Sequence, residues 1–176
     1  KGGKCGTLTF YDGTVTATNK GHSPGLRSWG AVIGDGNDAN SAADSNCRIN
    51  IYGGTISADN SSNSTAAAIG GGEDSKMSPV NILGGKITAK SANGAGIGSG
   101  QDGTSNTITI KNADVEAESI FGAGIGGGEY SDNESIIIEN STVKAKSITY
   151  GSGSGAEGAG IGGGNSGNSK SIKINK

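Results

Sequence analysis

The chain has 176 residues, of which 35 are glycine and only 2 are proline, and its formal net charge is -2. The glycines do not fall at every third position, which together with the scarcity of proline excludes a collagen helix. A charge so close to zero, with no basic stripe, argues against a nucleic-acid partner. No apolar run is long enough to cross a membrane as a helix, so we expect no membrane partner.

Only 31% of the residues are hydrophobic, a fraction that would also suit a disordered chain. Their positions are nevertheless regular, because apolar and polar residues alternate over short segments, as in half-buried strands. These segments come in pairs, which in chain order are residues 8–10 with 15–17, 49–51 with 56–58, 80–82 with 87–89, 108–110 with 115–117, and 136–138 with 143–145. Residues 172–174 begin a further pair.

A glycine-rich phrase follows each complete pair of segments. Its clearest copies are residues 94–101, 122–129 and 158–165, and looser copies are residues 30–37 and 67–73. The isoleucine of this phrase recurs every 28 residues from Ile69 to Ile125, and the spacing is 36 on either side of that stretch. A fixed period with insertions is typical of a solenoid, in which each repeat stacks on the next.

We therefore predict an all-β fold, a single-stranded, right-handed parallel β-helix of about five to six coils with three short strands in each coil. Residues 1–176 form a single domain in this interpretation, which we expect to be one module of a larger secreted protein. Each inward Ile or Val contributes roughly 1.5–3 kcal/mol when fully buried. In one repeat the inward residues are Ile108, Ile110, Val115, Ala117, Ala123 and Ile125.

Outward residues one repeat apart should lie above one another and form columns. Three such columns are Lys86, Asp114, Thr142; Thr88, Glu116, Lys144; and Lys90, Glu118, Lys146. Their charges alternate in sign from coil to coil, which favours cross-strand pairing. We interpret the columns as a device that specifies strand register, with a charged binding face as the alternative. Longer coils carry insertions, which we expect to be surface loops, at residues 19–29, 38–46, 60–65 and 149–157.

The two cysteines, Cys5 and Cys47, come just before the first strands of consecutive coils. Neighbouring parallel strands lie about 4.8 Å apart, within the Cα separations of about 4.4–6.8 Å that disulfides span. The spacing predicts a disulfide between the first two coils, which would indicate an exported protein. Two free cysteines are the alternative.

A polar column that contains Glu73 follows the glycine-rich phrase, beside a second column that contains Asp74 and Asp102. Stacked carboxylates repel one another, and a hard cation with oxygen ligands such as Ca²⁺ relieves that repulsion. These three residues are therefore a candidate calcium site, although no dedicated calcium-loop motif is present. The alternative is a solvated acidic edge, and no cofactor is required.

Aromatic residues are few, and Tyr11 and Tyr52 occupy the same column one coil apart. Both are expected to face outward, and Trp29 lies in a predicted loop. Exposed aromatic rings stack on the faces of sugar rings, so Tyr11, Tyr52 and Trp29 form the candidate ligand-binding row. The alternative is structural, with the tyrosines covering the corner and Trp29 fixing a loop onto the body.

The sequence offers no recognisable catalytic set. His22 is the only histidine, so a Ser-His-Asp triad would depend on it alone. A polysaccharide lyase would need a basic residue beside calcium carboxylates, yet Arg27 and Arg48 are the only arginines and lie near the first coils, away from Asp102. We therefore expect no catalytic residues and no enzymatic activity.

Residues 53–58, 84–89 and 122–128 resemble the glycine-rich β-helix repeats of large bacterial surface proteins. The likeness covers nearly the whole chain and implies an extracellular location, secreted or anchored to the cell wall. We expect a non-catalytic adhesion module, a monomer within a multidomain chain, that binds a polysaccharide or glycoprotein surface. A purely structural stalk and a β-helix polysaccharide lyase or glycosidase are the alternatives. The chain is more distantly similar to calcium-dependent carbohydrate-binding β-helices and to pectate-lyase-like folds, whose lyase motifs are missing here.

Overall fold

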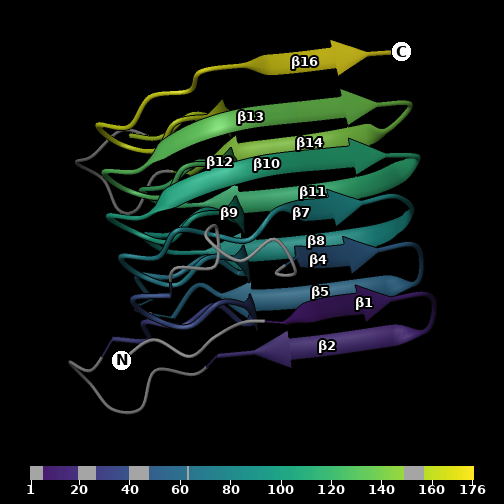
Figure 1. The fold of residues 1–176 in the computed structure, drawn as a ribbon, viewed down its shortest axis with the longest axis horizontal. Helices are drawn as coiled ribbons and strands as arrows, with labels where there is room; N and C mark the ends of the chain where they lie inside the picture. The colour runs from purple at the N-terminus through teal and green to yellow at the C-terminus, as the bar shows by residue number, and fades with distance from the viewer. Residues whose placement is uncertain (1–5, 20–26, 40–47, 63, 149–156) are drawn as a thin grey trace.

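The computed structural model describes residues 6–19, 27–39, 48–62, 64–148 and 157–176. Within these ranges the chain forms a parallel β-helix, in which each complete coil contributes one strand to each of three parallel sheets (Figure 1). The described strands make up five complete coils, and the last of them begins a sixth. The predicted architecture, stacked coils of three strands each, is thereby confirmed. In the described part of the chain no helix could cross a membrane.

The first sheet contains the opening strand of every coil. Alternation places Ile49 and Ile51 in the core and turns Asn50, between them, to the outer face. In the order in which they pair, the strands are β1 (Thr7–Phe10), β4 (Arg48–Ile51), β7 (Val80–Ile82), β10 (Thr104–Lys111), β13 (Asp132–Glu139) and β16 (Ile172–Asn175).

The second sheet follows the first after a tight corner. Its register confirms the predicted columns, since Glu116 pairs with Thr88 on one side and with Lys144 on the other. The strands are β2 (Thr14–Thr18), β5 (Thr55–Asn60), β8 (Gly85–Ser91), β11 (Ala113–Ser119) and β14 (Thr142–Ser147).

The third sheet is made of two-residue strands, each an isoleucine followed by a glycine. Ile97 pairs with Ile69 and with Ile125, so the 28-residue period read from the sequence is the length of each of the two central coils. The coils on either side, from Ile33 to Ile69 and from Ile125 to Ile161, are 36 residues long. The strands are β3 (Ile33–Gly34), β6 (Ile69–Gly70), β9 (Ile97–Gly98), β12 (Ile125–Gly126) and β15 (Ile161–Gly162).

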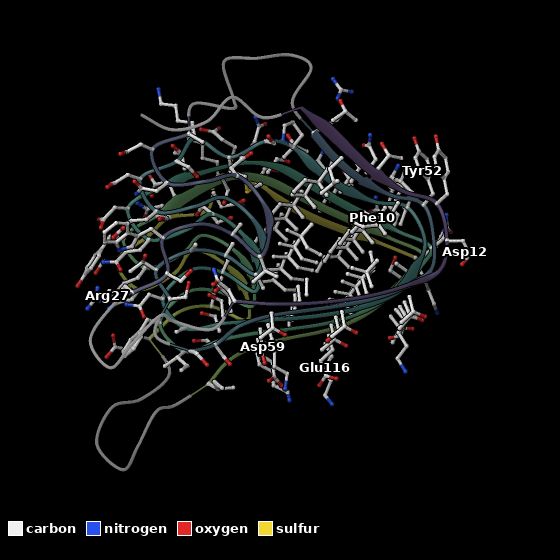
Figure 2. All side chains as sticks on the ribbon, turned by 90° about the horizontal axis from the view of Figure 1, so that it is seen from below. Phe10, Asp12, Arg27, Tyr52, Asp59 and Glu116 are labelled. Atoms are coloured by element: carbon white, nitrogen blue, oxygen red, sulfur yellow. The ribbon has the colours of Figure 1, made fainter. Side chains whose placement is uncertain are left out.

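The core lies between the sheets and is narrow. In a view down the axis of the solenoid, side chains of the first and second sheets point toward each other across the core (Figure 2). All six inward residues predicted for one repeat are at most 1% exposed, so the alternation identified the core correctly. They are Ile108, Ile110, Val115, Ala117, Ala123 and Ile125.

The tight corner between the first and second sheets needs a residue with positive φ in each coil. Gly13, Gly54 and Gly85 supply it in the first three coils, and Asn112 and Asn140 supply it in the next two. Glycine and asparagine are the residues that adopt this conformation at least cost, as expected from the sequence.

The glycine-rich phrase is required by contact between coils. A Cβ added to Gly98 would lie 1.8 Å from the carbonyl oxygen of Gly126 in the next coil, and the φ of Gly98 is +148°. A Cβ on Gly100 would lie 2.2 Å from the carbonyl oxygen of Gly72 in the preceding coil. The glycines therefore let successive backbones stack directly on one another.

One predicted surface loop, residues 60–65, is partly internal. Asn60 is the last residue of β5 and is fully buried, and Thr65 is fully buried as well. The Asn60 side-chain amide donates to the carbonyl oxygens of Ala66 and Ala67 at 3.1 and 2.9 Å. The Ala66 carbonyl also accepts from the Ser91 hydroxyl at 2.8 Å, so Asn60 joins a buried hydrogen-bond network, which explains why a polar residue lies inside.

Candidate functional site

The most distinctive surface feature is a pair of stacked tyrosines at the corner between the first and second sheets. Tyr11 and Tyr52 each follow the last residue of a first-sheet strand, and the Tyr52 amide donates to the Phe10 carbonyl at 2.8 Å. The ring centroids are 5.3 Å apart and the ring planes differ by 8°. Tyr11 is 74% exposed and Tyr52 is 47% exposed, so both rings contact solvent, as predicted.

The tyrosines begin a longer column. Leu83 occupies the equivalent position in the next coil, where its amide donates to the Ile51 carbonyl. The column therefore has an aliphatic residue after its two tyrosines. Lys111 comes next and forms an ion pair with Glu139 at 2.8 Å. Tyr11 is the first member, because β1 lies at the edge of its sheet.

A pair of amide side chains lies on the same outer face of the first sheet. The Asn81 side-chain amide donates to the Asn50 side-chain oxygen at 2.9 Å. Asn50 is two residues before Tyr52 on the same side of the strand, beside Thr9 of the preceding coil. Sequence reasoning did not single out these asparagines, although each is the outward residue between two apolar ones.

Trp29 lies at a different corner from the tyrosines. The Glu73 amide donates to the Trp29 carbonyl at 2.9 Å, which places Trp29 beside the predicted acidic column. Arg27, two residues earlier, is on the opposite side of the cross-section from Tyr52 (Figure 2). The three aromatic residues therefore do not form one row, and the structure brings together only Tyr11 and Tyr52.

The acidic residues Glu73, Asp74 and Asp102 lie at the corner that leads from the third sheet to the next coil. Asp74 and Asp102 hold equivalent places in successive coils, with φ of 54° and 55°. The pKa of the Glu73 carboxyl is raised above its ordinary value, mainly by burial and to a smaller extent by the negative charge of Asp74. Within the described ranges no group of three or more His, Cys, Asp or Glu side chains could hold a metal ion. The calcium site stays a prediction without support from this geometry.

The outer face of the second sheet carries the predicted charge columns. Glu118 lies between Lys90 at 3.4 Å and Lys146 at 3.0 Å, and Lys144 is 3.3 Å from Glu116. The hydrogen bond from Lys146 holds the pKa of the Glu118 carboxyl below its ordinary value. These charges are neutralised within the face, which favours the interpretation that they specify strand register.

Three residues considered for chemistry lie outside the described ranges. They are Cys5 and Cys47, for which a disulfide is predicted, and His22. The disulfide therefore stays a prediction.

The stacked coils, each with one strand in every sheet, define the class of protein: a parallel β-helix. A family model described as "Beta helix repeat" matches residues 49–73, 80–101 and 108–129. Each matched stretch begins in or at a first-sheet strand and ends at the acidic corner, so the matched repeats are the second, third and fourth coils. No curated protein and no solved structure matches the chain.

Proposed function

We propose that this β-helix is a non-catalytic binding module of an extracellular protein, and that it binds glycans of a host or cell-wall surface. It acts as a monomeric unit within a longer chain. The Tyr11–Tyr52 stack carries the proposal, because two large aromatic rings stay exposed on a mostly polar surface. Exposed apolar groups gathered in one place mark interaction sites more often than single ones do.

The surroundings of the stack suit a polar ligand with apolar faces. The Asn50–Asn81 amide pair and Thr9 supply donors and acceptors along the neighbouring strands. Aromatic rings combined with a few polar groups on a rigid frame are typical of sites that bind small polar molecules. A sugar ring has this mixed character, with C–H groups on its faces and hydroxyl groups around its edge.

The test is binding to a glycan array and to mucin and cell-wall preparations, each with and without calcium. We expect glycan binding that Tyr11→Ala combined with Tyr52→Ala weakens at least about ten-fold, a loss of about 1.4 kcal/mol of binding free energy. Tyr130→Asn is the matched control, because Tyr130 is 53% exposed at the distant acidic corner. Asparagine adopts the Tyr130 φ of 57° readily, so this variant should fold and bind normally.

Each outcome separates the functions under consideration. Glycan binding that survives the double substitution would show that the stack is the wrong site. An absence of any glycan, mucin or cell-wall binding would overturn the proposal and favour a structural stalk. Release of cleavage products from the polysaccharides on the array would establish an enzyme instead.

A further inference from the structure

The geometry of the tyrosine column limits where a ligand can stack. Aromatic rings bind flat partners through their faces, and the two tyrosines occupy one face of each other. The register places Leu83 on the other side of Tyr52 as the next member of the column. Among the described residues only Tyr11, as the first member, has a face with no column neighbour, and its greater exposure agrees with this position.

A carboxylate-bearing residue follows Tyr11 at the same corner of the coil. Asp12 directly follows Tyr11 at the exposed corner, and Asp12 and Tyr52 lie at the same edge of the cross-section in Figure 2. One Asp12 carboxylate oxygen accepts a hydrogen bond from the Gly13 amide at 2.7 Å, which fixes the side chain. Gly13 is the only hydrogen-bond partner of Asp12 among the described residues, so the other oxygen is available to hydroxyl donors.

We infer that the site takes one neutral pyranose ring of a glycan as the next member of the column, stacked on the free face of Tyr11, with Asp12 accepting its hydroxyl groups. This inference rests on the proposed glycan binding and specifies its ligand. Tyr52 is a positioning residue, which holds the Tyr11 ring flat and does not touch the sugar. The Asp12 charge disfavours acidic sugars, because a carboxylate of the ligand would lie close to it.

The site should therefore contact one sugar ring of the glycan, and the remaining sugars should extend away from the column. The rings of Tyr11 and Tyr52 are stacked face to face along the axis of the solenoid. They do not lie side by side with both faces open to one ligand. Two successive sugars therefore cannot each stack on a tyrosine. The selectivity should lie in the hydroxyl pattern of a single ring.

The experiment compares the same substitution in the two members of the column. Tyr11→Leu and Tyr52→Leu are titrated against short oligomers of glucose, mannose and N-acetylglucosamine, and against oligogalacturonate as the acidic probe. Tyr11→Leu should lose at least about ten-fold in affinity for the neutral oligomers, whereas Tyr52→Leu should lose less than about three-fold, because leucine still supports the Tyr11 ring. Tyr11→Phe, which keeps the ring face, should retain binding.

A second variant tests the selectivity. Asp12→Asn removes the charge but keeps a hydrogen-bonding oxygen, so the affinity ratio of neutral to acidic oligomers should fall by at least about three-fold. Equal losses in the two leucine variants, or an unchanged ratio in Asp12→Asn, would overturn the inference and leave the proposed glycan binding intact. Failure of the unaltered protein to bind every oligomer and the glycan array would overturn both.

Discussion

At the scale of single residues, the structure depends on positions that must be glycine because no side chain fits there. Gly98 lies where the backbones of neighbouring coils meet, and its φ of +148° is one that other residues rarely adopt. The glycine-rich phrase is therefore a packing requirement of the solenoid.

We predict that Gly98→Ala destabilises the protein by more than about 3 kcal/mol, because the new methyl group would overlap the Gly126 carbonyl in addition to the backbone strain. Urea unfolding followed by circular dichroism measures the change. Gly36→Ala is the control, since a Cβ at Gly36 meets no atom within 4 Å. Similar stabilities for the two variants would contradict this account of the phrase.

At the scale of the strands, the charge columns tie β8, β11 and β14 together. The pKa of Glu118 is lower in the folded state than its ordinary value, chiefly through the hydrogen bond from Lys146. The Glu118 carboxylate therefore stabilises the fold at pH values above its unfolded pKa of about 4.3. This contribution is lost as the pH falls through the lower folded-state pKa.

We predict that Glu118→Gln lowers the free energy of unfolding by about 0.5–1 kcal/mol at pH 7, the upper part of the range for surface pairs, because Lys90 and Lys146 are 46% and 41% exposed. The difference from the unaltered protein should shrink at pH 3 and in 1 M salt, as measured by urea unfolding. Glu134→Gln, at a more exposed single pair with Lys170, should have a smaller effect. A pH-independent difference would argue against an electrostatic origin.

The strands of the first two sheets could be predicted because apolar and polar residues alternate along each of them, including the terminal strands β1 and β16, whose apolar side chains stay partly or fully exposed. The third-sheet strands have only two residues, which is too short for an alternating pattern to be recognised. The regular recurrence of their isoleucine along the sequence identified them instead. The positive φ of Asp74 and Asp102 was missed, since aspartate is compatible with both solvated loops and this conformation.

The candidate site could be predicted in part from the same register. Tyr11 and Tyr52 come one residue after paired strand ends, so their column followed directly from the repeat. Trp29 could not be placed, because it is the last residue of a predicted insertion that interrupts the alternation. The sequence also does not reveal that the two rings cover each other's faces, which decides where a ligand can stack.

At the scale of the whole molecule, every site depends on the stacking of coils in one register. Isoleucines from all three sheets share a core. The strands of each sheet stack in parallel from coil to coil (Figure 1). A solenoid of this kind is stabilised mainly by contacts between neighbouring coils. A shift of one residue would exchange the inner and outer faces and disperse the tyrosine column.

The most direct test of that register is a disulfide between partners in adjacent coils. Thr88 and Glu116 are 28 residues apart and face each other across β8 and β11. Thr88→Cys with Glu116→Cys should oxidise readily, because paired parallel strands lie about 4.8 Å apart, within the span of a disulfide. Peptide mapping by mass spectrometry identifies the bond and distinguishes it from any that involves Cys5 or Cys47.

Thr88→Cys with Glu118→Cys is the matched control, displaced by two residues along β11. Its Cα separation exceeds about 7 Å, beyond the reach of an unstrained disulfide. The register predicts rapid cross-linking of the 88–116 pair and little of the 88–118 pair. Equal cross-linking of both pairs, or preference for the 88–118 pair, would contradict the stacked coils and the site built on them.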